Sequence, residues 1–513
     1  MIPQPQSITP GKGHIQVTGQ NLTTSIDSSL PSEGYTLDIG TSGEGDADDN
    51  GTVCVTGGSE AGVFYGRQTF RQLLPPSSLR RAGKESQGPW QISVQRITDA
   101  PRFAWRGVML DVARHFMPLP DVLRFIDLAA FHKLNVLHLH LTDDQGWRLP
   151  VEKWPRLTTV ACWRKRSMLG AKEHEKYDAR PHGGFYSKED LQEIVAFAAE
   201  RHITVVPEID MPGHMQAAIA AYPALGNGKE VDVRDSWGIS KHVLNMSDET
   251  VGFCRDVLNA ACEIFPDKFI GIGGDECPHD EWKASEAVQA RIKELGLTDE
   301  SALHRWFVGQ MANHLGSQGR RAYGWDEVLG GADGGKIPAD VLIAAWRGIE
   351  PTKIAAQRGF EVVACPDVAA YLDYRQSGDE NEPTPMGTVL TAEDVYAFEP
   401  VPEGLTKDEK KKVIGAQANI WTEHMESARR VDYMAYPRLC AMAEVTWGKS
   451  AQHSTEDFKK RLQEHVQRLE ALGVNYRPLS GPHPWDARPD ALGKPKTMEQ
   501  RLEKQARFTA DLM

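Results

Sequence analysis

The chain has 513 residues, of which 40% are apolar and 25% charged, and its net charge is −13. This composition is typical of a globular protein and excludes a disordered chain. The negative charge argues against nucleic acid or an anionic membrane as a partner. No apolar run approaches the roughly 18 residues that would span a bilayer, so no membrane segment is expected.

The length predicts about three domains, or one barrel of roughly 250 residues or more with one or two satellites. Seven cysteines are scattered without any Cys-x-x-Cys spacing. We therefore expect reduced thiols rather than disulfides or a structural zinc site. Residues 1–6 show no basic segment leading into an apolar stretch, so we expect no secretory signal and a cytoplasmic location. Among the partners we count a second copy of the chain in a homodimer.

Residues 1–100 predict a small α+β domain. Its short apolar runs are separated by turn-rich stretches such as 40–51. A helical pattern over 61–74 stops at Pro75-Pro76, where the chain cannot continue a helix. The segments expected to be strands are 15–17, 35–39, 52–55 and 90–94.

Residues 101–448 alternate candidate strands with amphipathic helical patterns. This rhythm is typical of an α/β fold with parallel βαβ units, and eight strands close a (β/α)8 or TIM barrel. The strands are expected at 107–112, 136–141, 203–209, 269–272, 321–325, 341–346, 361–364 and 413–420. The helices are expected at 121–132, 188–201, 214–221, 250–264, 285–295, 301–318, 351–358 and 431–447.

Residues 449–513 predict a helical extension that packs outside the barrel. Its main helical pattern covers 457–472, is rich in charged residues and stops at Gly473.

The most informative motif is Gly273-Gly274-Asp275-Glu276, which follows the apolar run 269–272. A buried strand has no packing reason to end in two acids, because burying a carboxylate is expensive unless it is paired or used. Glycines at this point let the backbone turn or let a ligand approach closely. The alternative is structural, with Asp275 capping the next helix and Glu276 in solvent.

In a (β/α)8 barrel, functional residues gather at the C-terminal ends of the strands. The predicted ends bring acids, tryptophans, a tyrosine and an arginine to one rim. Such a set suits a sugar, because aromatic faces cover pyranose rings and charged groups bind hydroxyls. The candidates are Arg114, Asp144, His214, Asp275, Glu276, Trp325, Trp346, Tyr371, Asp373, Trp421 and Glu423.

Each candidate also has a structural alternative. A tryptophan or tyrosine at a single strand end is more often a packing residue, and Arg114 could simply pair with Asp111. His138 and His140 lie two apart on a strand and so face the same side, where two imidazoles can hold a catalytic metal. That pair alone lacks the further ligands of a metal-dependent hydrolase, so we favour histidines that hydrogen-bond to nearby acids and expect neither a metal nor a cofactor.

Eight ordered motifs across roughly residues 50–480 give the chain a specific resemblance. Together the chain resembles the family 20 glycoside hydrolases, the exo-acting β-N-acetylhexosaminidases. The motifs are GVFYGRQTF at 62–70, RGVMLDVARHF at 106–116, HLHLTDDQGWR at 138–148, PEIDMPGH at 207–214, GGDE at 273–276, GWDE at 324–327, QANIWTE at 417–423 and LGVNYRP at 472–478.

The resemblance implies a mechanism in which the 2-acetamido group of the substrate is the nucleophile and forms an oxazolinium intermediate. Glu276 would then be the general acid and base, while Asp275 would hold the acetamido N–H and Tyr371 its oxygen. The residues alone leave Glu423 or Asp144 open as an ordinary nucleophile. The substrates implied are β-linked N-acetylglucosamine or N-acetylgalactosamine glycans, including chito-oligosaccharides.

The resemblance also implies how the sugar is bound. Trp325, Trp346 and Trp421 would enclose the acetamido methyl group, and Arg114 and Glu423 would grip the hydroxyls of the non-reducing end. Asp144 and His214 would frame the site, and Asp373 would touch the sugar. Relatives often carry a further tryptophan in the loop after strand seven, but residues 379–398 contain none. A sugar-binding protein without turnover is the rival interpretation, although a binder has little need of the acid Glu276.

Overall fold

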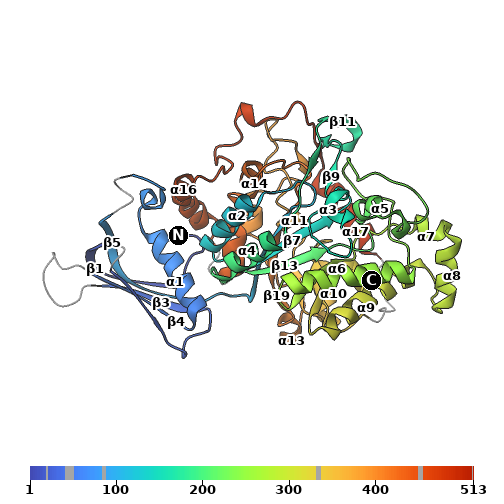
Figure 1. Ribbon diagram of the computed structural model, residues 1–513. Helices are drawn as coiled ribbons and strands as arrows, with labels where there is room; N and C mark the ends of the chain where they lie inside the picture. Colours follow the sequence, from blue (N-terminus) through green and yellow to red (C-terminus); the bar gives the residue numbers. More distant parts are fainter. Residues whose placement is uncertain are drawn as a thin grey trace.

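The computed structural model describes residues 1–18, 21–40, 51–83, 88–330, 337–448, 454–510 and 512. A small N-terminal domain lies beside a larger body of strands and helices (Figure 1). Two expectations fall outside the described residues: the turn-rich stretch at 41–50 and the start of the C-terminal extension at 449.

The N-terminal domain is a five-stranded sheet covered by one helix, which confirms the α+β prediction. The strands lie in the order β1-β5-β3-β4-β2, and all neighbours are antiparallel except β2 and β4. Helix α1 (Glu60–Leu73) buries Val63, Tyr65 and Phe70, so the core of this domain is sandwiched between sheet and helix. The remaining elements are β1 (Ser7–Val17), β2 (Leu22–Ile26), β3 (Tyr35–Gly40), β4 (Thr52–Gly57), η1 (Pro76–Leu79) and β5 (Trp90–Asp99).

A buried carboxylate at the end of β5 joins this domain to the barrel. Oδ2 of Asp99 accepts hydrogen bonds from the Tyr35 hydroxyl at 2.7 Å, from Nζ of Lys133 at 3.0 Å and from Nε1 of Trp447 at 2.9 Å. Lys133 and Trp447 belong to the barrel domain. The two domains therefore share a charged and fully hydrogen-bonded junction.

Eight parallel strands close into a barrel, as predicted. Neighbours pair in the ring order β13-β14-β15-β16-β17-β19-β6-β7, and β7 pairs with β13 to complete the ring. Because helices cover the outside, these strands are buried on both faces along nearly their whole length. They are β6 (Trp105–Asp111), β7 (Val136–Asp143), β13 (Thr204–Ile209), β14 (Phe269–Gly273), β15 (Arg321–Trp325), β16 (Leu342–Ala345), β17 (Val362–Ala364) and β19 (Val413–Ile420).

The helices around the barrel follow the predicted pattern with one difference. The single helix expected over 431–447 is two helices, because Pro437 has no N–H with which to continue the first. The helices of this layer are α2 (Leu119–Phe131), α4 (Lys188–Ala199), α5 (Gln216–Ala221), α6 (Asp248–Ile264), α8 (Glu286–Glu294), α9 (Glu300–Ser317), α10 (Glu350–Gln357), α14 (Ala428–Ala435) and α15 (Arg438–Trp447).

Short elements lie in the loops between the barrel strands, and most of them follow the C-terminal ends of the strands. After β7 come β8 (Gly146–Trp147), α3 (Arg156–Thr159), β9 (Trp163–Arg164), β10 (Met168–Leu169), η3 (Lys172–His174), β11 (Lys176–Tyr177) and β12 (His182–Gly183). The later loops carry η4 (Pro223–Leu225), α7 (Asp280–Ala284), η5 (Asp326–Leu329), α11 (Asp367–Ala370), β18 (Met386–Gly387), α12 (Ala392–Tyr396) and α13 (Lys407–Lys410).

The C-terminal region contains two separate helices. The first, α16 (Thr455–Ala471), lies beside the N-terminal domain, where the Arg468 guanidinium donates to the backbone oxygen of Gln72. After η7 (Pro484–Asp486) and β20 (Lys494–Pro495), helix α17 (Met498–Phe508) lies against the mouth of the barrel. The prediction for the extension named only the pattern at 457–472, which corresponds to α16. Among the described helices, none has the length and apolar character needed to cross a membrane.

Candidate active site

Two glycines at the end of β14 shape the turn into Asp275 and Glu276. Gly273 and Gly274 have φ angles of 64° and 88°, which residues with a side chain rarely adopt. A Cβ atom on Gly273 would lie only 1.7 Å from Oδ1 of Asp210, so no side chain fits there. Glu276 itself has a φ angle of 43°. Such a conformation in a residue other than glycine is uncommon and clusters at functional sites.

The two acids differ in their contact with solvent. The side chain of Asp275 is 11% exposed, whereas that of Glu276 is 25% exposed and lines a cavity of about 530 Å³. Burial raises the pKa of Asp275 to about 6, with His214 opposing the rise and Glu276 adding to it. Oδ1 of Asp275 is buried and has no hydrogen-bond partner among the described residues. An unpaired buried oxygen is costly, so this atom is suited to accept a donor from a ligand.

His214 connects this acidic pair to the acids at the end of β7. Its Nδ1 atom lies 3.2 Å from Oδ1 of Asp143, and its Nε2 atom lies 3.7 Å from Asp275 and 3.8 Å from Glu276. Burial disfavours the charged ring, but the surrounding carboxylates outweigh burial and raise the pKa of His214 well above its usual value. A positive imidazolium here balances part of the negative charge of the site.

Arg114 lies behind β6 with its donors fixed by carboxylates. Its Nη2 atom is 2.8 Å from Oδ2 of Asp143, and its Nη1 atom is 3.4 Å from Oδ2 of Asp111. The guanidinium also lies over the ring of Trp421, 4.9 Å from the centroid. Arg114 therefore does pair with Asp111, as the structural alternative for this residue predicted. The same side chain also contacts the ring of Trp421.

Three further predicted acids surround this group. Burial raises the pKa of Glu423, although Arg114 opposes the rise, and burial raises the pKa of Asp373 well above its usual range with help from Glu423. Oδ1 of Asp373 is another buried oxygen without a partner among the described residues. Asp144 is fully buried and accepts the backbone N–H of Gln216 at 3.0 Å, so it holds the start of α5.

The predicted aromatic residues form one wall. The rings of Trp325 and Trp421 lie 5.8 Å apart, those of Tyr371 and Trp421 lie 6.2 Å apart, and Trp346 stacks on Tyr371 at 6.0 Å with an interplanar angle of 18°. Two of the indoles are held by acids, since Trp325 Nε1 donates to Glu208 at 2.7 Å and Trp346 Nε1 donates to Glu327 at 3.0 Å. Such fixed rings make a rigid apolar surface.

His138 and His140 lie deeper in the barrel and face an acid. His138 Nε2 is 2.9 Å and His140 Nδ1 is 2.6 Å from the same oxygen of Glu208, and His140 Nε2 is 2.9 Å from Asp143. These contacts match the interpretation of histidines bonded to nearby acids. Some acids and histidines of the site lie close enough to one another to share a metal ion, for example Asp143, Asp144 and His214.

Three acids that organise the site were not among the predicted site residues. Asp143 contacts Arg114 and His214, Glu208 orients Trp325, and Glu327 orients Trp346. Each stands at a strand end, which is the signal that could have found it. All eleven predicted residues lie around the same end of the barrel.

Two protein-family models match the chain. Residues 1–100 match "Glycosyl hydrolase family 20, domain 2", and residues 103–450 match "Glycosyl hydrolase family 20, catalytic domain". A Porphyromonas gingivalis beta-hexosaminidase is 39% identical over 464 residues, which cover 90% of this chain and 56% of that protein. An Akkermansia muciniphila beta-hexosaminidase is 36% identical over 426 residues, which cover 81% of each chain. The chain spans little more than half the length of the P. gingivalis protein and of a 38% identical Vibrio furnissii beta-hexosaminidase, of which it covers 57%.

Solved structures show the same architecture. A crystal structure of the exo beta-N-acetylglucosaminidase from Vibrio harveyi in complex with N-acetylglucosamine superposes with a TM-score of 0.80 at 30% identity. The superposition covers 94% of this chain and 78% of that one. A beta-N-acetylhexosaminidase from Streptomyces coelicolor has a TM-score of 0.77 at 29% identity and covers 94% of this chain and 98% of its own.

Proposed function

Because this chain belongs to glycosyl hydrolase family 20, we propose that it is an exo-acting β-N-acetylhexosaminidase. Its substrates would be glycans that end in β-linked N-acetylglucosamine or N-acetylgalactosamine, including chito-oligosaccharides. The observation that carries this proposal is the adjacent pair Asp275 and Glu276: Glu276 lines a cavity together with Trp346 of the aromatic wall, and Asp275 lies more deeply buried beside it. A purely sugar-binding site would have no use for two acids held in this strained turn.

We propose that hydrolysis retains the anomeric configuration and uses the substrate's own acetamido group. The acetamido oxygen attacks the anomeric carbon while Glu276 donates its proton to the leaving oxygen. The departing alcohol leaves an oxazolinium ion, and Glu276 then takes a proton from the water that opens it. Intramolecular attack needs orientation above all, because an effective molarity on the order of 10⁵ M or more can replace a second protein nucleophile.

Asp275 is placed to orient and stabilise the acetamido group. Its unpaired Oδ1 atom accepts the acetamido N–H, and its negative charge stabilises the positive charge that develops on that nitrogen. Tyr371 donates to the acetamido oxygen from the other side. Trp325, Trp346 and Trp421 enclose the acetamido methyl group and so select N-acetylated sugars.

The remaining polar residues of the site bind the non-reducing end of the sugar or hold the residues that do. Arg114 donates to sugar hydroxyls, and Glu423 accepts from them. Because these residues occupy the space beyond the non-reducing end, the site binds only one terminal sugar. Asp373 has a free buried oxygen for a further hydroxyl. Asp144 and His214 keep these groups in place.

A chromogenic assay tests the proposal. The 4-nitrophenyl β-glycoside of N-acetylglucosamine should be cleaved at least about 10³-fold faster than the matching glucoside, which lacks the acetamido nucleophile. Addition of EDTA should leave the rate unchanged. Absence of chromophore release would favour the binding protein, loss of rate with chelator would favour a metal hydrolase, and efficient glucoside cleavage would exclude the assisted mechanism.

A further inference from the structure

The cavity beside Glu276 is walled on one side by the C-terminal helix. We call it the Glu276 cavity, and its lining includes Glu276, His279, Arg305, Trp346, Arg507 and Phe508. The last two residues belong to the end of α17, which lies beyond the part of the chain that matches the family's catalytic domain. This helix therefore adds surface to the place where the leaving group must depart.

Buried contacts hold α17 in this position. Arg501 and Gln505 both donate to the carboxylate of Asp367, which follows β17 and is fully buried. The Arg347 guanidinium donates to the backbone oxygen of Phe508 at 2.5 Å. Charge-assisted hydrogen bonds in a buried setting are strong and directional, so the end of α17 is a fixed part of the mouth.

The exposed side of this cavity is positively charged. Arg305 and Arg507 line it, and Nζ of Lys504 lies 4.6 Å from the centroid of the Phe508 ring, which also lines it. Within the described part of the chain none of these three cations forms an ion pair with a carboxylate. Lys504 is close enough to Glu276 for that carboxylate to favour its charged form, although burial lowers the pKa of Lys504 overall. Unpaired cations are notable in a chain whose net charge is −13.

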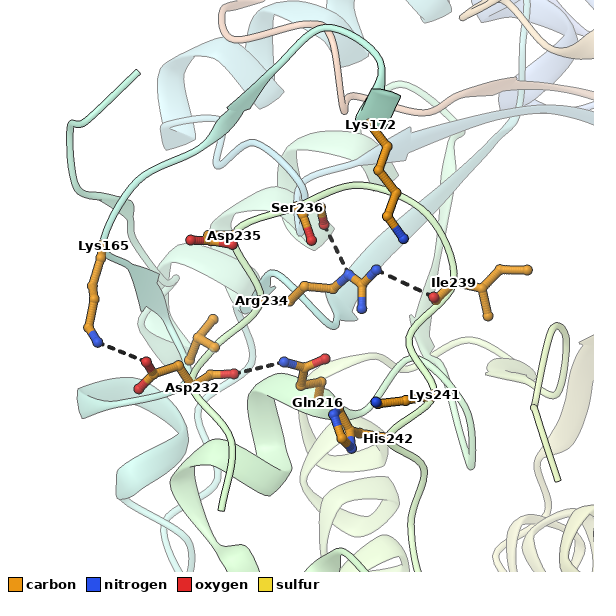
Figure 2. A pocket seen from close by; sticks show the side chains of 11 residues that line it. Lys165, Lys172, Gln216, Asp232, Arg234, Asp235, Ser236, Ile239, Lys241 and His242 are labelled. Carbon is orange, nitrogen blue, oxygen red and sulfur yellow. Dashed lines mark hydrogen bonds and ion pairs between the residues drawn. The ribbon is translucent and has the colours of Figure 1, made fainter. Parts of the chain in front are cut away.

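A second basic cavity adjoins the first. Ile239, an exposed apolar side chain, lines both cavities. The second cavity, which we call the basic pocket, has a volume of about 520 Å³ and lies between the loops that follow β7 and β13 (Figure 2). Four Lys or Arg and two Asp side chains line it, which leaves a surplus of two positive charges.

The cations of the basic pocket fall into two groups. Lys165 is paired with Asp232 at 2.8 Å. Arg234 instead donates to the backbone oxygens of Ser236 and Ile239, as Figure 2 shows, so its position is set without neutralising its charge. Lys172 and Lys241 likewise have no carboxylate partner among the described residues. Asp235, the other acid of the lining, is paired with Arg166 outside the pocket. The charges of Lys172, Arg234 and Lys241 thus remain for an anionic ligand.

We propose that the preferred leaving group is an acidic sugar chain, which lies against α17 in the Glu276 cavity and continues over Ile239 into the basic pocket. This inference rests on the proposed glycosidase function and adds the chemical class of the leaving group. The recognised groups are carboxylates or sulfate esters on the leaving sugars, contacted first by Arg305, Lys504 and Arg507. Groups further along the chain are contacted by Lys172, Arg234 and Lys241.

The first experiment compares two disaccharides that differ in one carboxylate. Both carry β1,4-linked N-acetylglucosamine, on glucuronic acid in one and on glucose in the other. At low ionic strength, kcat/KM should be about five- to tenfold higher for the acidic disaccharide, because each partly exposed charge pair gives a factor of about two to five. A third disaccharide, with glucose 6-sulfate as the leaving sugar, distinguishes a carboxylate from a sulfate ester. If both acidic disaccharides are preferred equally over the neutral one, the site recognises negative charge. If only one is preferred, the site recognises its carboxylate or its sulfate group.

Variants test whether the preference for the acidic disaccharide depends on the cations of α17 and on Arg305 of α9. The triple variant Arg305→Gln, Lys504→Gln and Arg507→Gln should bring the ratio of acidic to neutral kcat/KM close to one, mainly through KM, and should change kcat/KM for the neutral disaccharide far less than that for the acidic one. Arg67→Gln on the exposed face of α1 is the control and should leave the ratio unaltered. A wild-type ratio of one or less, or a ratio that survives the triple variant, would overturn this inference. Lack of cleavage of every substrate would instead refute the proposed function.

The basic pocket needs a longer substrate. A tetrasaccharide that alternates N-acetylglucosamine and glucuronic acid should gain a further severalfold in kcat/KM over the acidic disaccharide, and this gain should disappear near 1 M NaCl. The variant Lys172→Gln, Arg234→Gln and Lys241→Gln should remove the gain for the tetrasaccharide and leave the disaccharide unchanged. An unchanged tetrasaccharide rate in that variant would exclude the basic pocket from the site.

Discussion

Asp99 and Asp275 are both buried acids at the ends of strands, but their surroundings differ. Asp99 accepts hydrogen bonds from three side chains at the domain junction, and its other oxygen accepts the backbone N–H groups of Ala100 and Gln6. Asp275 has a buried oxygen without any partner among the described residues, and burial raises its pKa to about 6. A carboxylate whose donors are complete stabilises the fold, whereas one that lacks a donor is available to a substrate.

The strongest test of this contrast concerns the neighbour of Asp275. Glu276→Gln keeps the shape of the side chain but removes the proton that the leaving oxygen needs. We expect kcat on an unactivated glycan to fall by as much as about 10⁴-fold, with little change in sugar binding, as measured by steady-state kinetics and calorimetry. Glu200→Gln, on the outer surface, should behave like the wild type. Near-normal turnover by the Glu276 variant would remove the assigned acid.

The opposite outcome is expected at the junction. Asp99→Asn leaves the buried ammonium of Lys133 without a counter-ion, and the free energy of unfolding should drop by about 3–5 kcal/mol. Urea unfolding measures this loss, while the turnover number per folded molecule should be unchanged. Asp38→Asn removes an exposed pair with Arg96 in the same sheet and should cost less than about 1 kcal/mol. A loss of turnover in the Asp99 variant would contradict the separation of roles.

Asp275→Asn should lower kcat by about 10²–10³-fold, because a neutral amide cannot stabilise the charge that develops on the substrate. Its effect on stability depends on pH. The pKa of Asp275 is about 6 in the folded protein against an ordinary value of 3.8, so between these pH values only the folded state keeps the proton. The free energy of unfolding of the wild type therefore falls as pH rises through this window.

The Asn variant lacks this titration. The difference in melting temperature, variant minus wild type, should accordingly be more positive at pH 7 than at pH 4. A difference that is the same at both pH values, or more negative at pH 7, would mean that the site does not hold the Asp275 proton.

The smallest effect is expected from Trp447→Phe, which removes one donor to Asp99 and keeps the aromatic packing. Loss of a hydrogen bond to a charged group should cost about 1.5–3 kcal/mol of unfolding free energy. Trp485→Phe at an exposed position is the control and should have no measurable effect. A Trp447 variant as stable as the wild type would show that this hydrogen bond to Asp99 does not stabilise the fold, which would contradict the role given to Asp99.

Most of the fold could be predicted because the barrel strands are buried on both faces. Runs such as 136–141 and 413–420 are mostly apolar, with two polar side chains in each, and alternate with segments of helical periodicity. That pattern leaves few other folds. The split between α14 and α15 could have been expected from Pro437, although periodicity alone continued across it.

The hydrogen bonds within the site could not be predicted where the two residues lie far apart in the chain. Position at a strand end identified Asp275 and Glu276, but nothing in the sequence indicates that Glu208 orients Trp325 across 117 residues. The place of α17 was also missed. Its residues are mostly polar, so no apolar face marks the segment 498–508, and nothing in it points to Asp367, to which Arg501 and Gln505 bind.

Trp447 links the two regions that match the family models, because it belongs to one region and packs in the core of the other. It ends the last helix of the barrel, yet its buried ring completes the hydrophobic core of the N-terminal domain. Exchange of residues 1–100 between relatives would therefore need a matching aromatic residue some 350 positions away. Recombination at residue 100 would separate two halves of one core, so the two regions should be inherited together.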